Sequence, residues 1–256
     1  MMPGSDGSAV ERKYRVIARD LRTAIGQGEY PAGSRLPGEN DLMRRYQVAR
    51  MTARQALALL INEGLAVARK GSGVYVRDFR PVIRSGADRL SARGWGSGRS
   101  VWSADASHRE LSVDQIEVRR AIPPDHIRLL LDLPDDPDEK VIARSRRYVL
   151  DGKPVLLSVS YLPSGLAAGT AMEYQDAGPG GVYARLRELG HPPVRFREDL
   201  RARMPEPAET ARLGLPPGTP VVDIVRTAFA ADRQAVEVSE MIADAAAYVF
   251  RYDFDA

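Results

Sequence analysis

The stretch from residue 36 to residue 64 constrains the fold of this chain more than any other part of the sequence. Read at helical spacing, it predicts two helices joined by a short turn. The second predicted helix places Arg50 and Arg54 one turn apart, with Thr52 close by. The opposite side of this helix is apolar at Ala53, Ala56, Leu57 and Leu60. An apolar back and an arginine-rich front suit insertion into a DNA major groove, so we predict that this region binds an operator.

The flanking residues predict the rest of a small domain. A first helix is expected from Lys13 to Gly28, and Gly38 is placed to cap the second helix. After the third helix, two short apolar runs at residues 65–67 and 74–76 flank a basic, glycine-rich tip at residues 69–73. This pattern is typical of a β-hairpin. Three helices followed by a basic hairpin predict a winged helix-turn-helix.

Charge is distributed unevenly along the chain. Of the 37 Lys and Arg residues, 14 lie in the first 80 residues, against 8 of the 34 Asp and Glu residues. The front therefore has a net charge of +6 and the remainder a net charge of −3. This division indicates that only the front meets a polyanion, although many small domains carry such a charge without binding nucleic acid.

Composition excludes several classes of protein. The absence of cysteine excludes disulfides and thiolate metal sites and is typical of a cytoplasmic protein. The mean hydropathy of −0.31 and the lack of a long apolar run argue against a membrane span. The start of the chain lacks the basic and apolar regions of a signal peptide. Because His108, His126 and His191 have no metal-ligand spacing, we expect no metal site and no cofactor.

The front of the chain resembles the DNA-binding domain of GntR-type bacterial transcriptional regulators. The resemblance is carried by Gly33-Ser-Arg-Leu-Pro37, Glu39, Ala49-Arg-Met-Thr-Ala-Arg54, Asn62-Glu-Gly-Leu65 and Gly71-Ser-Gly73. It implies that DNA is contacted by Arg35, Arg50, Thr52 and Arg54, and that the hairpin tip with Lys70 and Gly71 enters the adjacent minor groove. The chain departs from the family at Gly38, where serine is usual, so no side-chain hydroxyl is available at that position.

The rear of the chain predicts an antiparallel α+β domain. Helices are expected at residues 124–131, 181–188 and 205–213, and strands at 141–149, 155–161, 194–202, 220–229 and 235–242. Asp151-Gly152 is a strong signal for a tight hairpin turn. A helix, Leu133-Pro134 and a strand are echoed by a helix, Leu215-Pro216 and a strand, which indicates two related halves with a cleft between them, unless the echo is a coincidence.

This rear region resembles the effector-binding domain of the HutC-type branch of these regulators, called UTRA, whose fold is similar to that of chorismate lyase. The carrying residues are Arg144-Ser-Arg-Arg147, Asp151-Gly-Lys-Pro154, Ser160-Tyr-Leu-Pro163, Gly181-Val-Tyr183, Val236-Glu-Val238 and Tyr248. The resemblance implies a pocket for a small, often anionic metabolite. It assigns effector contacts to Tyr183, Glu237 and Tyr248.

Alternation along two predicted strands supports part of this pocket. Arg144 and Arg146 project from one face of their strand, and Ser158 and Ser160 share a face of the partner strand. Paired arginines beside hydroxyls suit a carboxylate or a phosphate. The alternative is that the two arginines form a solvent-facing stripe, and that Glu237 likewise faces water.

Two departures bear on the ligand. Gly181 stands where sugar-phosphate binders tend to carry serine, which disfavours a sugar phosphate. The usual Arg-x-Asp-x-Tyr ending is Asp244-Ala-Ala-Ala-Tyr248 in this chain. Trp95 and Trp102 are placed either to line an apolar pocket or to bury the segment that carries them.

The sequence thus predicts an α+β protein in which a winged helix-turn-helix is joined to a chorismate-lyase-like antiparallel α/β effector domain. We expect a disordered leader at residues 1–10, the DNA-binding domain at 11–77, a linker at 78–90 and the effector-binding and dimerisation domain at 91–256. The predicted function is a cytoplasmic, ligand-responsive repressor, not an enzyme, that binds a pseudo-palindromic operator as a homodimer. The alternatives are a ligand-independent repressor of the plasmid-transfer type and a chorismate-lyase-like enzyme.

Overall fold

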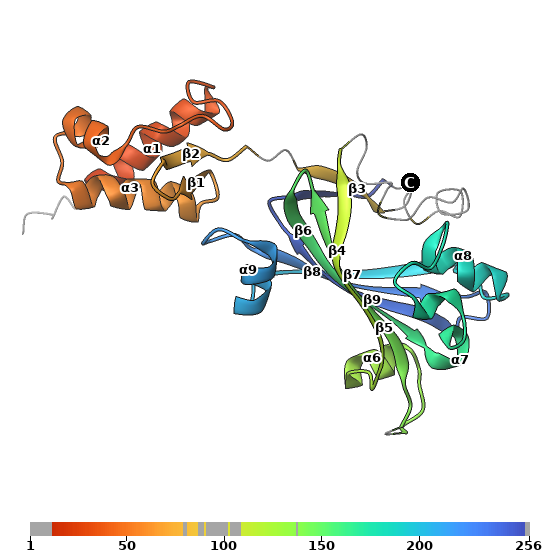
Figure 1. The fold of residues 1–256 in the computed structure, drawn as a ribbon. Coiled ribbons are helices and arrows are strands. Elements are labelled where there is room, and N and C mark those ends of the chain that lie inside the picture. Colours follow the sequence, from red (N-terminus) through yellow and green to blue (C-terminus); the bar gives the residue numbers. More distant parts are fainter. Residues whose placement is uncertain are drawn as a thin grey trace, which may run out of the picture. The chain divides into compact units, whose positions relative to one another are not determined.

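The computed structural model describes residues 12–78, 81–86, 90, 102, 109–136 and 138–253. The chain forms two compact units (Figure 1). The first is made by the front residues together with Pro216–Thr219, and the second by the rest of the chain, from the short strand β3 (Val82–Ser85) onward. No helix of the described residues is long and apolar enough to cross a membrane.

The first unit contains three helices and a hairpin (Figure 1). These are α1 (Lys13–Gly26), α2 (Glu39–Tyr46), α3 (Arg50–Asn62), β1 (Ala66–Arg69) and β2 (Gly73–Val76). Its core joins all three helices through buried side chains that include Ile17, Leu21, Leu42, Leu57 and Leu60. The apolar side predicted for α3 is therefore the side that packs, and the predicted winged helix-turn-helix is confirmed.

Local chemistry sets the ends of α2 and α3. The backbone N–H of Gly38 donates to a carboxylate oxygen of Asp41 at 3.2 Å, so the helix is capped without a side chain at position 38. The turn between the two helices passes through Gln47, whose φ of 51° lies in the left-handed region. Gly64, with a φ of 74°, follows the end of α3, as expected for a glycine after a helix C-terminus.

The hairpin is widened by a third extended segment. The N–H groups of Gly33 and Leu36 donate to the carbonyl oxygens of Val76 and Val74 at 3.1 and 2.9 Å. Arg35 forms an antiparallel bridge with Tyr75 in the same segment. The residues before α2 are thereby fixed beside the wing.

The second unit is built on a six-stranded antiparallel sheet in the order β4-β5-β6-β9-β8-β7 (Figure 1). Its strands are β4 (Leu111–Ala121), β5 (Val141–Leu150), β6 (Lys153–Pro163), β7 (Arg195–Arg203), β8 (Val221–Phe229) and β9 (Ala235–Asp244). The helices are α6 (Asp125–Leu130), α7 (Ser164–Ala167), α8 (Gly181–Glu188), α9 (Pro207–Leu213) and the 3-10 turn η1 (Ala171–Glu173). A separate pair is formed by β3 (Val82–Ser85) and β10 (Tyr248–Arg251), which run parallel.

The sheet consists of two halves with the same order of elements. The units β4–α6–β5–β6 and β7–α9–β8–β9 meet where β6 pairs with β9, with Ser160 opposite Ser239. Each half also reaches across the junction, because α6 contacts β9 and α9 contacts β6. The weak echo in the sequence therefore corresponds to a repeated strand-helix-strand-strand arrangement.

The predicted hairpin turn at Asp151-Gly152 is present, with φ values of 47° and 74° that suit a tight turn between twisted strands. Three strands, β3, β4 and β10, were not predicted from the sequence. β4 contains a bulge between Asp114 and Glu117, which breaks the alternation that would have revealed it. β3 lies inside the stretch predicted as a linker, and its four residues are too few for a periodic signal.

Candidate functional sites

The first candidate site is the N-terminal half of α3, where two arginines share one carboxylate. Glu39, the first residue of α2, accepts hydrogen bonds from Arg54 Nε at 2.8 Å and Arg54 Nη2 at 3.3 Å. Arg50 Nε lies 3.7 Å from the same carboxylate, and its Nη2 donates to Asn40 Oδ1 at 3.2 Å. The side chains of Arg50 and Arg54 are nevertheless 60% and 58% exposed. They are held in place and remain available to a partner.

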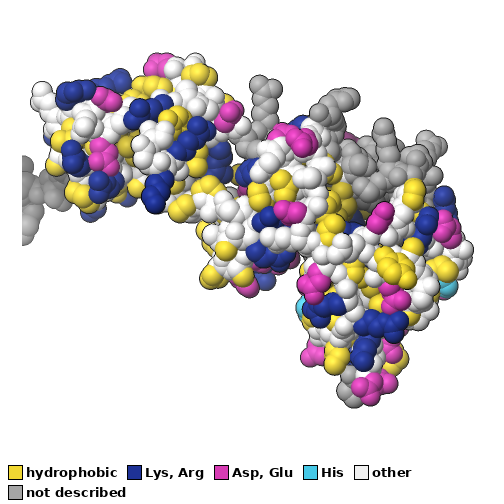
Figure 2. Space-filling model, viewed as in Figure 1, with side chains coloured by type: hydrophobic (Ala, Val, Ile, Leu, Met, Phe, Trp, Pro, Cys, Tyr) yellow, Lys and Arg dark blue, Asp and Glu magenta, His cyan; other side chains and the backbone are white. Residues whose placement is uncertain are grey.

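The Glu39 carboxyl stays ionised beside the two arginines. The hydrogen bond from Arg54 holds the pKa of the Glu39 carboxyl below its usual range, although the desolvation of Glu39 acts in the opposite direction. Lys and Arg side chains are spread over the visible face of the first unit (Figure 2). An exposed cationic face with arginines fixed by one neighbouring carboxylate is suited to a polyanion.

The wing presents the remaining residues predicted to contact DNA. Lys70 and Gly71 are exposed at the hairpin tip, and Gly71 has a φ of 73° with open space where a Cβ would stand. Arg35 lies against Gly73, because a Cβ added there would stand 2.9 Å from Arg35 Nε. Thr52 is half-buried in the first turn of α3, between the exposed arginines. The structure thus places every predicted DNA contact in the first unit.

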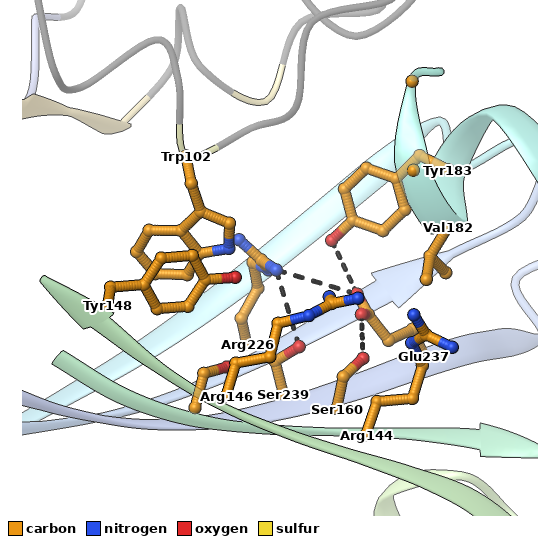
Figure 3. A pocket seen from close by; sticks show the side chains of 13 residues that line it. Trp102, Arg144, Arg146, Tyr148, Ser160, Val182, Tyr183, Arg226, Glu237 and Ser239 are labelled. Atoms are coloured by element: carbon orange, nitrogen blue, oxygen red, sulfur yellow. Dashed lines mark hydrogen bonds and ion pairs between the residues drawn. The ribbon is translucent and has the colours of Figure 1, made fainter. Parts of the chain in front are cut away.

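The second candidate site is a cavity of about 80 Å³ in the second unit, formed on the face of the sheet that carries α8 (Figure 3). Its lining comes from both halves of the sheet and from α8. The polar lining residues are Arg144, Arg146, Tyr148, Ser158, Ser160, Tyr183, Arg226, Glu237 and Ser239. In β5 and β6, Arg144 stands opposite Ser160 and Arg146 opposite Ser158. The cross-strand proximity expected from alternation is confirmed.

Glu237 lies at the centre of this cavity and is only 3% exposed. It accepts hydrogen bonds from the hydroxyls of Ser160 and of Tyr183, the latter at 2.6 Å (Figure 3). Burial and the nearby Glu237 charge raise the pKa of Tyr183 well above its usual value, while Arg226 acts in the opposite direction. The carboxylate is therefore fixed inside the cavity by two hydroxyl donors, and the alternative that it faces water is wrong.

Arg144 is buried in the cavity wall and binds main-chain oxygens. It is 1% exposed and donates to the carbonyl oxygens of Met172, Tyr174 and Gln175, the last two at 2.6 and 3.1 Å. Burial, together with the charge of Arg146, lowers the pKa of Arg144 to about 10. A solvent-facing stripe is excluded for this residue.

The structure does not bring Tyr248 to the cavity. The chain turns after Asp244, and Tyr248 then enters β10, which pairs with β3 and not with the six-stranded sheet. Its ring lies 6.0 Å from that of Phe250. Tyr248 is absent from the residues that line the cavity.

Sequence reasoning missed Arg226 and Ser239, which face each other across β8 and β9. The internal repeat of the rear region could have indicated them. Arg226 opposite Ser239 in one half matches Arg146 opposite Ser158 in the other. Trp102 also lines the cavity, with its ring 4.3 Å from that of Tyr148, whereas Trp95 lies outside the described residues. Among the described residues, no group of three or more His, Asp or Glu side chains could hold a metal ion.

Comparison with known proteins decides the family. Residues 13–76 match the model of the bacterial regulatory proteins of the gntR family, and residues 106–249 match that of the UTRA domain. The chain belongs to the GntR family and carries a UTRA domain.

Relatives of this GntR-family regulator match most of its length. An HTH-type transcriptional regulator of Rhizobium meliloti is 30% identical, over 88% of the chain and 93% of that protein. The HTH-type transcriptional repressor NagR of Bacillus subtilis is 24% identical, over 94% of both. A crystal structure of a GntR-family transcriptional regulator superposes with a TM-score of 0.64 at 27% identity, over 96% of this chain and 98% of that one. The protein is therefore a DNA-binding transcriptional regulator, and these relatives are regulators.

Proposed function

We propose that this regulator is a repressor that binds a pseudo-palindromic operator as a homodimer and is released when a small molecule occupies the cavity of the UTRA domain. The exposed pair of arginines on α3, fixed by Glu39, is the observation that carries the DNA-binding part. A dimer is expected because one reading helix covers only a short half-site.

Within this proposal, Arg50 reads a base. It stands at the first position of α3, and an arginine there can pair with O6 and N7 of guanine. Arg54 and Thr52 lie further along the helix and contact phosphates. Arg35, Lys70 and Gly71 bring the wing to the adjacent minor groove, where Gly71 allows close approach of the backbone.

Release by an effector requires that the ligand favour one arrangement of the protein over another. We propose that occupation of the cavity favours an arrangement whose two DNA-binding units no longer match the half-site spacing. A coupling free energy of about 1–3 kcal/mol changes operator affinity by about 5- to 150-fold.

Fluorescence anisotropy tests the proposal on DNA from the region upstream of the gene, against scrambled DNA and across a salt series. We expect an operator preference of about a thousandfold or more and a steep loss of affinity with salt. Equal binding to both DNAs contradicts operator recognition. Compounds that bind the protein and leave operator affinity unchanged contradict release by an effector.

A further inference from the structure

Arg226 is the buried cation of the cavity with the fewest acceptors. It is 3% exposed, and its Nε and Nη1 atoms have no hydrogen-bond partner among the described residues. Its Nη2 lies 3.5 Å from Ser239 Oγ and 3.7 Å from Glu237 Oε2, so both contacts are long (Figure 3). An arginine side chain only donates hydrogen bonds and stays charged, so a further partner has to be an acceptor.

The charges around Arg226 leave a positive excess. Glu198 is paired with the buried Arg84 at 2.5 Å, which balances that carboxylate. Among the residues that line the cavity, the carboxylate of Glu237 is then the one negative charge beside three positive charges, those of Arg144, Arg146 and Arg226. An excess of buried positive charge costs free energy unless an anion compensates it.

The three arginines differ in how far they are already occupied. Arg144 is committed to three carbonyl oxygens. Arg146 donates to the carbonyl oxygen of Gln175 at 2.9 Å and is half-buried. Arg226 bonds to no carbonyl oxygen among the described residues and keeps two buried nitrogens, Nε and Nη1, without a hydrogen-bond partner, whereas Arg144 keeps only Nε. Of the two buried arginines, Arg226 therefore has the greater capacity for a ligand.

The position of Arg226 in the sheet also supports its role as a ligand contact. Arg226 opposite Ser239 and Arg146 opposite Ser158 occupy matching places in the two halves, and all four line one cavity. The side chains of Arg146 and Arg226 rise from the same face of the sheet (Figure 3). The rings of Trp102 and Tyr148 form an aromatic wall next to them.

We propose that Arg226, facing Arg146 across the cavity, is the main contact for a carboxylate or phosphate group of the effector, which is therefore a small organic anion. This inference rests on the proposed effector function. It assigns Arg144 to holding the segment 172–175 through its carbonyl oxygens, and it gives anion recognition to a residue outside the family motifs quoted above.

Isothermal titration calorimetry of the full chain without DNA, at constant ionic strength, tests this assignment. The probes are benzoate and phenyl phosphate, with benzamide as a neutral control of similar shape. We expect at least one anion to bind about tenfold or more tightly than benzamide, because hydrogen bonds to a charged group are strong. Whether benzoate or phenyl phosphate binds more tightly shows whether the site prefers a carboxylate or a phosphate.

The variant Arg226→Gln should weaken binding of that anion by about tenfold or more, and Arg226→Lys should weaken it less. Arg201→Gln, an exposed arginine of β7, is the matched control and should bind as the wild type does. Circular dichroism and thermal unfolding establish that each variant is folded. If Arg226→Gln does not fold, Arg226→Lys is compared with Arg146→Lys. A larger loss of anion affinity in Arg226→Lys supports the proposal, and a larger loss in Arg146→Lys overturns it.

The proposal is overturned if benzamide binds as tightly as both anions, if neither anion binds the wild-type chain, or if folded Arg226→Gln binds like the wild type. These results leave the anisotropy experiment untouched, since no DNA is present. Loss of operator recognition, in turn, does not affect anion binding. The two proposals therefore fail separately.

Discussion

The two candidate sites use arginine in opposite environments. Arg50 and Arg54 are more than half exposed and share one carboxylate, whereas Arg144 and Arg226 are 1% and 3% exposed. A solvated guanidinium can exchange an internal acceptor for a phosphate or a base edge at little cost in free energy, because water hydrogen-bonds to it while it changes partners. A buried guanidinium must keep its acceptors or gain new ones. The same side chain is thus suited to reading DNA in one unit and to fixing a wall or binding an anion in the other.

Replacing Arg144 should have the largest effect on stability. The change Arg144→Met removes the donor to three carbonyl oxygens, and we expect the free energy of unfolding of the second unit to fall by about 2–4 kcal/mol. Urea denaturation measures this. Arg201→Gln serves as the exposed control, with a change of less than about 0.5 kcal/mol expected. An unchanged midpoint for Arg144→Met would show that these carbonyl bonds contribute nothing net.

Replacing Arg50 should leave stability intact and reduce the preference for the operator sequence. In Arg50→Ala the operator should lose about 1–3 kcal/mol of discrimination over scrambled DNA, while weak and salt-sensitive binding persists. Anisotropy on both DNAs gives the ratio. Arg22→Ala, at an exposed ion pair with Glu63 away from the start of α3, is the control. Retained preference in Arg50→Ala would mean that another residue reads the base.

The residues of the DNA-binding site could be predicted from the sequence more fully than those of the cavity. The DNA-binding unit is made of local elements, and an apolar stripe with arginines on the other side of one helix is visible at fixed spacing. Arg50 and Arg54 could therefore be located on α3 from the sequence. Their shared acceptor could not be identified, because Glu39 lies on another helix and its partners depend on how α2 and α3 pack.

The lining of the cavity depends on which strands pair, and the pairing of distant strands cannot be predicted from local sequence patterns. Arg144, Arg146, Ser158 and Ser160 were predictable because β5 and β6 form one hairpin. Arg226 enters the cavity only because β9 pairs with β6 across the two halves. Tyr248 was assigned by resemblance alone, and the short strand pair β3–β10 carries it away from the cavity.

Glu39→Gln would sharpen the comparison by releasing the exposed arginines without removing them. Since exposed ion pairs are weak, we expect operator preference to fall by less than about tenfold. Non-specific binding should rise slightly, because one negative charge is removed from the DNA-facing side. Glu63→Gln, at the other end of α3, is the matched control and should leave preference unchanged. A loss as large as that of Arg50→Ala would show that Arg50 depends on Glu39 for its position.

The smallest expected effect is that of pH on the Glu39 pair. Because Arg54 lowers the pKa of Glu39 in the folded chain, the pair's contribution to stability is fully present above the carboxyl pKa of the unfolded chain. It is lost as pH falls through the lower folded pKa. The stability difference between the wild type and Glu39→Gln, from urea denaturation, should therefore stay constant between about pH 8 and about pH 6 and shrink only in acid. A difference that changes in the neutral range would point to a group other than this carboxylate, since the arginines it binds do not titrate there.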